Sequence, residues 1–190
     1  TRKVNDNAVT EFIFNESGYA WIFPKSDHFN VGIGNLINNK NIRKRTKEDL
    51  FKFVEQRYQG REIKDITAFP IGTEGIGYIA KNNVLLVGDA AGLAETLLGE
   101  GIYNAVISGK YAAQSIIKGQ ENNKSATPIY NSFLNRLSNE LTLYNKGAKI
   151  LYGFPKISYF AMKLWLGEKF MTGYSKGQTL SEIMGKKTQL

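Results

Sequence analysis

The sequence contains no cysteine and only one histidine among its 190 residues. The lack of thiols excludes disulfides, thiolate metal sites and a cysteine nucleophile, and a single imidazole offers little to a metal, so no metal site is predicted. No stretch approaches the roughly 18 consecutive apolar residues that a membrane-spanning helix needs. The first residues have no apolar run of the signal-peptide type. These features favour a cytoplasmic protein.

Acidic residues are also few, since 17 Asp and Glu stand against 25 Lys and Arg, a net charge of +8. Such an excess attracts nucleic acid, an anionic membrane surface or a phosphorylated substrate, and a solvated basic face explains it equally well. Basic residues cluster only at 43–47 and at Lys186 and Lys187. Because no exposed aromatics are interleaved with them as in a known binding module, no nucleic-acid partner is predicted.

Residues 84–117 contain the most informative pattern. Val84 to Val87 are four consecutive apolar residues, which predicts a strand buried on both faces. Asp89 follows at the strand end, where α/β proteins bring residues to a ligand. The next residues are small and allow close backbone approach: Ala90, Ala91, Gly92 and Ala94.

A helix is predicted to open at Gly99-Glu100-Gly101, with an apolar face that packs closely: Ile102, Val106, Gly109, Ala113 and Ile116. Unpaired N–H groups at its start, on Gly101, Ile102 and Tyr103, would favour an anionic or electron-rich group. An ordinary strand-turn-helix capped by Asp89 fits the same residues.

The first 35 residues predict an antiparallel meander of three strands, at 11–14, 19–23 and 29–33. Alternation puts Tyr19, Trp21 and Phe23 on one face. These aromatics could form plain core or wall a long apolar ligand.

The remaining segments are expected to form mainly structural elements that support the site. A helix is expected at 46–58, starting at Thr46, then a strand at 62–69, and a long helix with Thr127 as N-cap that ends at Gly147. Residues 150–171 predict short helices in which lysines lie among aromatics. That mixture fits a core lid, the wall of a lipid tunnel or a patch resting on a membrane.

Gly88-Asp89-Ala90-Ala91-Gly92 followed by Gly99-Glu100-Gly101-Ile102 resembles the second flavin motif of aromatic-hydroxylase-like FAD enzymes and, more narrowly, that of the geranylgeranyl reductase family. The resemblance implies that Asp89 binds the ribityl chain of FAD. It also implies that the segment from Gly99 to Asn104 places a helix start beside the pyrimidine edge of the flavin. The sequence departs from many relatives at Thr96-Leu97-Leu98, where they carry a proline and a threonine.

A second resemblance is more specific. Tyr19-x-Trp21-x-Phe23-Pro24, then seven residues, then Gly32-x-Gly34, is similar to a pattern associated with the geranylgeranyl reductases. The resemblance implies that this sheet lines the cavity for the isoprenoid chain. A Pro-x-Gly segment such as Pro70-Ile71-Gly72 lies near the flavin ring in related enzymes.

The expected fold class is α+β: an antiparallel substrate-domain sheet and helix (1–80), a strand-loop-helix that completes an FAD-binding α/β domain (81–120), and C-terminal helices (121–190). No Gly-x-Gly-x-x-Gly loop for the FAD pyrophosphate occurs, and the chain does not begin with methionine. The resemblance therefore implies a C-terminal half whose partner is a missing N-terminal FAD-binding half.

The function implied by the resemblance is FAD-dependent reduction of carbon–carbon double bonds in a geranylgeranyl chain, carried by a lipid or a diphosphate. Lys25 is a candidate phosphate contact. No catalytic residue is assigned, although Tyr19 or Tyr103 is conceivable as a proton donor. The alternatives are a related FAD monooxygenase or halogenase, and a basic module that binds nucleic acid or contacts a membrane peripherally.

Overall fold

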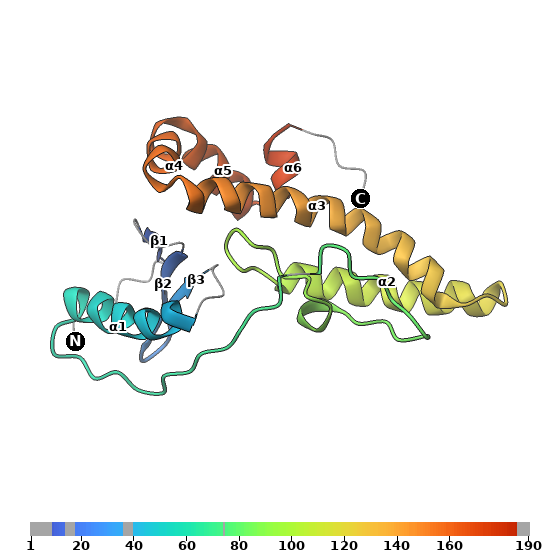
Figure 1. Ribbon diagram of the computed structural model, residues 1–190, viewed down its shortest axis with the longest axis horizontal. Helices are drawn as coiled ribbons and strands as arrows, with labels where there is room; N and C mark the ends of the chain where they lie inside the picture. Colours follow the sequence, from blue (N-terminus) through green and yellow to red (C-terminus); the bar gives the residue numbers. More distant parts are fainter. Residues whose placement is uncertain (1–8, 14–17, 36–39, 74, 186–190) are drawn as a thin grey trace. The chain divides into compact units, whose positions relative to one another are not determined.

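The computed structural model describes residues 9–13, 18–35, 40–73 and 75–185 (Figure 1). The chain divides into two compact units, unit 1 at Thr1–Ala68 and unit 2 at Phe69–Leu190. A three-stranded antiparallel sheet accompanied by helices confirms the α+β class. The finer division at residues 80 and 120 stays a prediction.

Unit 1 is built on the predicted meander. Strands β1 (Val9–Ile13), β2 (Gly18–Pro24) and β3 (Phe29–Asn35) pair in chain order; residue 14, expected in the first strand, lies outside the described residues. One face of β2 and β3 packs with Phe53 of helix α1 (Lys40–Arg57), and Ala20 and Ile22 supply the buried centre. The core of unit 1 therefore lies on the side of the sheet opposite Tyr19, Trp21 and Phe23.

Two sequence predictions in unit 1 are wrong in detail. Helix α1 begins at Lys40, so Thr46 lies inside it and not at its start. The expected strand at 62–69 has no regular secondary structure, and almost all its residues are exposed. A strand needs a neighbour for its backbone groups, and this segment has none among the described strands.

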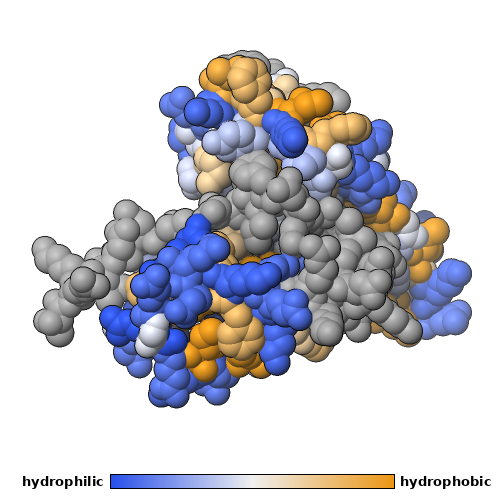
Figure 2. All heavy atoms as spheres, turned by 60° about the vertical axis from the view of Figure 1, so that its left-hand side comes forward, coloured by the Kyte–Doolittle hydropathy of each residue, from blue (hydrophilic) through white to orange (hydrophobic). Residues whose placement is uncertain are grey.

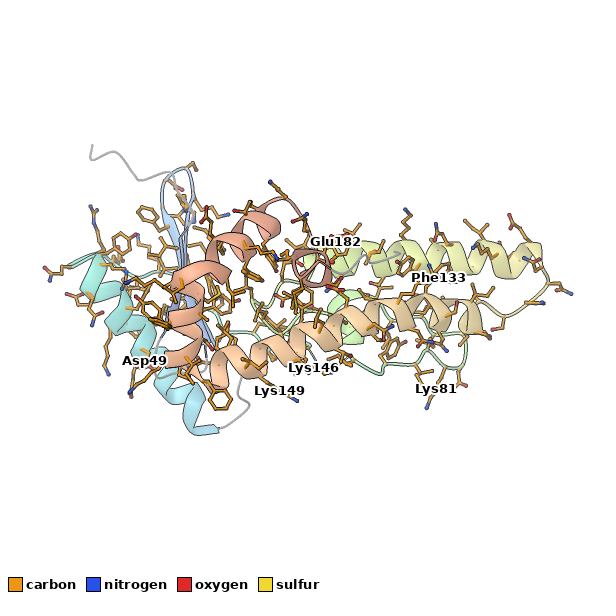
Figure 3. The ribbon with its side chains drawn as sticks, turned by 90° about the horizontal axis from the view of Figure 1, so that it is seen from above. Asp49, Lys81, Phe133, Lys146, Lys149 and Glu182 are labelled. Atoms are coloured by element: carbon orange, nitrogen blue, oxygen red, sulfur yellow. The ribbon has the colours of Figure 1, made fainter. Side chains whose placement is uncertain are left out.

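Unit 2 is formed mainly by helices. They are η1 (Gly88–Ala91), α2 (Ile102–Glu121), α3 (Ala126–Gly153), α4 (Pro155–Ala161), η2 (Met162–Leu166), α5 (Gly167–Ser175) and α6 (Leu180–Ile183). Helices α2 and α3 lie side by side (Figures 1 and 3). Phe133 of α3 stacks on Tyr111 of α2, with 4.8 Å between ring centroids.

Helix α3 is longer than its sequence pattern suggests. Its N-cap is Ser125, whose hydroxyl accepts from the Thr127 N–H at 3.3 Å, and it runs on to Gly153. Thr127 and Gly147, the predicted start and end, therefore lie inside it. Glycine inside a helix costs about 1 kcal/mol relative to alanine but does not by itself end the helix.

The face of α2 that packs is the reverse of the predicted one. Ile102 and Val106 are 80% and 69% exposed, whereas the buried stripe consists of Asn104, Ser108, Tyr111, Ser115 and Gly119. Hydroxyls on this stripe donate to carbonyls of the same helix, Ser108 to Asn104 at 2.6 Å and Ser115 to Tyr111 at 2.7 Å. The polar groups of these buried serines are therefore satisfied.

The predicted strand at Val84 to Val87 is also wrong. This segment forms only an isolated bridge between Lys81 and Val84, and Val84 is 55% exposed. Tyrosine side chains hold it instead of a sheet: the Leu86 N–H donates to the Tyr78 hydroxyl at 3.0 Å, and the Tyr130 hydroxyl donates to the Leu86 carbonyl at 2.7 Å.

The described residues have neither a membrane-spanning helix nor a cluster of metal-binding side chains. No helix in them is long and apolar enough to cross a membrane. They also contain no cluster of three or more His, Cys, Asp or Glu side chains that could hold a metal.

Candidate functional site

The loop from Gly88 to Gly101 brings the predicted flavin residues of unit 2 together. Helix η1 starts at Gly88 (φ +53°) and ends at Gly92 (φ +69°), so both glycines occupy the left-handed region that disfavours side chains. Ala91 is buried against the helical core, while Ala90 is exposed. The loop is therefore shaped by backbone conformation.

Asp89 is exposed on this loop, and its carboxylate lies beside the start of α2. A Cβ atom at Gly101 would lie 3.3 Å from Asp89 Oδ1 and 3.4 Å from Ala94 Cβ. Gly101 itself has an ordinary φ of −129°, so the reason for glycine here is close approach. An exposed carboxylate beside a helix start can accept hydrogen bonds from hydroxyl groups of a ligand.

A second segment supports the Asp89 loop from the side. The Ala94 N–H donates to the Gly72 carbonyl at 3.1 Å, and the Gly75 N–H donates to the Gly92 carbonyl at 2.8 Å. A Cβ at Gly72 would lie 2.8 Å from the Asp89 carbonyl oxygen. Gly72 thus contacts the Asp89 loop, while the position of the Pro70-Ile71-Gly72 segment near a flavin ring stays a prediction.

The start of α2 differs in one respect from the sequence prediction. The Tyr103 N–H donates to Glu100 Oε1 at 3.0 Å, so this N–H is already satisfied. Gly101 is the N-cap and has no side chain that could cap a backbone N–H group. Ile102, the next residue, is 80% exposed. Fewer N–H groups at the start of α2 are therefore available to an anionic ligand than predicted. Glu100 binds one of them and places its own negative charge there.

Asn104 faces inward. Its Nδ2 donates to the Leu93 carbonyl at 2.8 Å, and it is only 6% exposed. Ser108, one turn further along α2, accepts from the Gly88 N–H at 3.0 Å. These two side chains tie the Asp89 loop to α2, which gives Asn104 a structural contact in addition to the flavin contact that the resemblance implies.

Glu95 is the residue that sequence reasoning missed. It is 2% exposed, and its carboxylate accepts N–H groups of Leu97 (2.6 Å), Leu98 (2.7 Å) and Glu100 (3.1 Å). Burial raises the pKa of Glu95 above its usual range, although the three N–H groups oppose this. The signal in the sequence is an acidic residue just before a glycine-containing segment. Such a side chain can accept hydrogen bonds from backbone N–H groups two to five residues later.

The C-terminal helices fix the same loop. The Tyr174 hydroxyl of α5 donates to Glu95 Oε1 at 3.3 Å, and the Tyr152 hydroxyl of α3 donates to the Leu97 carbonyl at 2.5 Å. Burial and the nearby Glu95 raise the pKa of the Tyr174 phenol far above its usual value, so it stays a donor. Two tyrosines, 55 and 79 residues further along the chain than the groups they bind, thus hold the loop at 95–101 in place. This loop leads into the start of α2, beside which the Asp89 carboxylate lies.

The predicted substrate residues form one continuous surface in unit 1. Tyr19, Trp21 and Phe23 lie on the same face of β2, with ring centroids 5.8 Å and 6.4 Å apart along the row. Phe23 is 41% exposed, and Tyr19 and Trp21 are partly exposed. Since the core lies on the opposite face, the aromatic row is an accessible wall.

The glycines of the motif explain how the rings lie. Trp21 pairs with Gly32 across the strands, and Tyr19 pairs with Gly34. A Cβ at Gly32 would overlap the Trp21 indole, and one at Gly34 would lie 3.3 Å from the Tyr19 ring. The rings therefore spread flat over the backbone of β3. Trp21 Nε1 donates to Asn30 Oδ1 at 2.8 Å and fixes the indole.

The turn after Pro24 carries the remaining candidates. The Lys25 N–H donates to the His28 carbonyl at 2.9 Å, and His28 Nδ1 lies 2.7 Å from Asp27 Oδ1. This exposed contact lowers the pKa of Asp27. The phosphate contact of Lys25 stays a prediction.

Residues 1–73 match the family model of the geranylgeranyl reductase catalytic domain. The chain is 34% identical over 142 residues to a chloroplastic geranylgeranyl diphosphate reductase of Oryza sativa, covering 74% of this chain and 30% of that protein. It is 36% identical over 143 residues to digeranylgeranylglycerophospholipid reductase 2 of Methanosphaera stadtmanae, covering 70% and 36%.

One solved structure is also similar. A geranylgeranyl bacteriochlorophyll reductase-like protein from Thermoplasma acidophilum matches with a TM-score of 0.56 and 31% identity, over 70% of this chain and 36% of that one. The chain thus spans about a third of the length of the curated relatives that it matches.

Proposed function

Because the chain belongs to the geranylgeranyl reductase family, we propose that it forms part of an FAD-dependent enzyme that reduces carbon–carbon double bonds of a geranylgeranyl lipid or diphosphate. The observation that carries the proposal is the Asp89 carboxylate beside Gly101 at the start of α2. Such a carboxylate accepts hydrogen bonds from hydroxyl groups like those of a ribityl chain. The missing side chain of Gly101 lets the carboxylate lie close to the start of α2.

The residues present fit a flavin. Asp89 would hold hydroxyls, and the N–H groups at the start of α2 other than that of Tyr103, which Glu100 binds, would lie against an electron-rich ring edge. Glu95 and Ser108 would keep this backbone in place before any ligand arrives, which reduces the ordering cost of binding. When bound and reduced by an external donor, the flavin would supply a hydride to one carbon of the double bond, and a proton would be added at the other carbon.

The aromatic row of β2 would receive the isoprenoid chain. Tyr19, Trp21 and Phe23 cover roughly 14 Å of strand, at about 3.4 Å a residue, and present flat apolar rings. Branched apolar chains gain from contact with such a wall and from exclusion of water. The row would therefore orient the chain without forming a bond to it.

The longer catalytic assembly is needed for a test, since the pyrophosphate loop is absent from this sequence. We expect the 190-residue chain alone to bind FAD weakly and to be inactive. A titration of the chain that showed stoichiometric submicromolar binding would contradict this part of the proposal.

The decisive experiment is a chimera in which this chain replaces the aligned segment of the Thermoplasma acidophilum digeranylgeranylglycerophospholipid reductase. The chimera should bind FAD and reduce geranylgeranyl lipid with a chemical reductant. Asp89→Asn should weaken FAD binding at least about tenfold, whereas Glu121→Gln, at the exposed far end of α2, should leave it unchanged. Equal FAD affinity in both variants, or oxygen-dependent turnover of aromatic substrates instead, would overturn the proposal.

A further inference from the structure

The segment from the end of α3 to η2, residues 150–164, has large apolar side chains that are mostly exposed to solvent. Ile150 and Phe154 at the end of α3 are 62% and 60% exposed, and Ile157, Phe160 and Leu164 in α4 and η2 are 70%, 64% and 67% exposed. Five such side chains within 15 residues form a contiguous exposed group, which in soluble proteins marks an interaction surface. They are not core, so this segment is no buried lid.

Helical spacing arranges these side chains in a row. Ile157, Phe160 and Leu164 follow one another at intervals of three and four residues, so they share one side of the helix. Ser158, which is buried and donates to the Ile150 carbonyl at 3.2 Å, marks the inward side. The segment is therefore amphipathic, with its apolar row directed outward.

Lysines border this row. Lys156 and Lys163 are exposed and seven residues apart, so they lie two turns apart beside the apolar side chains. Residues 146–176 contain six lysines and a single acidic residue, Glu168. Lys146 and Lys149 project from α3 in the turns before α4 (Figure 3). Figure 2 shows hydrophobic and hydrophilic side chains side by side at the top of the view, where α4 lies.

We propose that α4 and η2 dock on an anionic lipid bilayer, with Ile157, Phe160 and Leu164 entering the headgroup region and Lys156 and Lys163 binding lipid phosphates. An outward apolar row with lysines on its flank is the pattern of helices that lie in a membrane interface. The two elements have 7 and 5 residues, fewer than the 20 or so that a bilayer span takes, so the contact is at the interface.

The exposed face of α2 provides the matched comparison. Val106 and Ile117 are 69% and 54% exposed, so that helix is also apolar on its outer side. Its 20 residues carry two lysines and one glutamate, however, and the excess of positive charge is small. Charge complementarity therefore favours the α4–η2 surface over the α2 face for anionic lipid.

The test is co-sedimentation of the 190-residue chain with vesicles of phosphatidylcholine, with and without about one quarter phosphatidylglycerol. The chain should bind the anionic vesicles, and high salt should weaken this binding. Phe160→Ser with Leu164→Ser should lower the partition coefficient at least about tenfold, and so should Lys156→Glu with Lys163→Glu. Val106→Ser with Ile117→Ser should leave it unchanged. Circular dichroism establishes that each variant is folded.

Three outcomes would overturn the inference: no binding to anionic vesicles, equal loss in the α2 variant, or a concentration-dependent dimer that the Phe160→Ser, Leu164→Ser variant abolishes. The last would assign the surface to a second copy of the chain. Because these vesicles contain neither FAD nor isoprenoid, failure here leaves the proposed reaction standing, and failure of the FAD experiment leaves the membrane contact standing.

Discussion

The aromatic row of β2 and the Asp89 loop differ in how far along the chain their supporting residues lie. Trp21 is fixed by Gly32 and Asn30, which follow within 11 residues on the neighbouring strand. The loop around Asp89 depends on Ser108, Tyr152 and Tyr174, contacts that span 20 to 79 residues. A surface made from adjacent strands can be recognised in a short motif, whereas a loop held by distant helices cannot.

The largest effect should follow removal of the carboxylate that organises the loop. Glu95→Ala leaves three N–H groups without their acceptor in a buried place, and the free energy of unfolding of unit 2 should fall by about 3 kcal/mol. Urea unfolding followed by circular dichroism measures this.

Glu121→Ala serves as the control, because Glu121 is exposed at the end of α2. Its stability should change by less than about 0.5 kcal/mol. A Glu95→Ala variant as stable as this control would mean that the loop keeps its shape without the carboxylate.

In the sheet, the corresponding change is at Gly32. Gly32→Ala places a methyl group in the Trp21 indole, so unit 1 should lose about 2 kcal/mol and the ring should move. Trp21 fluorescence in a Trp165→Phe background reports both. Gly34→Ala, where the added atom would lie 3.3 Å from the Tyr19 ring, should cost less. The reverse order would show that the two rings do not lie over these glycines.

A smaller effect is expected where α2 holds the loop. Ser108→Ala removes the acceptor of the Gly88 N–H, and unit 2 should lose about 1 kcal/mol. Ser115 is equally buried but bonds only the Tyr111 carbonyl of its own helix. Ser115→Ala should therefore be milder in the same urea assay, and equal losses would indicate that the bond to Gly88 contributes nothing.

The smallest effect concerns pH. Burial raises the pKa of Glu95 above its ordinary value of 4.5, so the folded state binds this proton more tightly than the unfolded state. The resulting stability is present below that value and is lost as pH rises through the folded-state pKa. Wild type should therefore lose stability relative to Glu95→Gln as pH rises above 4.5. A constant difference between the two proteins would show that burial does not perturb Glu95.

Local pattern predicted the sheet of unit 1 well. Short polar sequences at 15–18 and 25–28 separate the aromatic runs, and this spacing predicts the meander because neighbouring strands pair through short connections. The Tyr-x-Trp-x-Phe-Pro and Gly-x-Gly spacing specified which residues meet, and Trp21 opposite Gly32 is the result.

The same reasoning failed where burial depends on distant partners. Val84 to Val87 read as a buried strand, yet tyrosines from residues 78 and 130 bind this segment. Helix α2 exposes Ile102 and Val106 and buries Tyr111 on its other side, beside serines whose hydroxyls bond within the helix. Periodicity predicts that a helix has two unlike faces, but the neighbouring element decides which face is covered.

The sequence by itself determined the α+β class, the family resemblance, the aromatic row and the acid that precedes α2, because each depends on spacing over a few residues. Tertiary structure alone decided that Glu95 would be buried under three backbone donors and that the Asp89 carboxylate would lie beside Gly101. The physical reason is that a polar group acquires its energetic role from what surrounds it, and those surroundings come from segments far away in the chain.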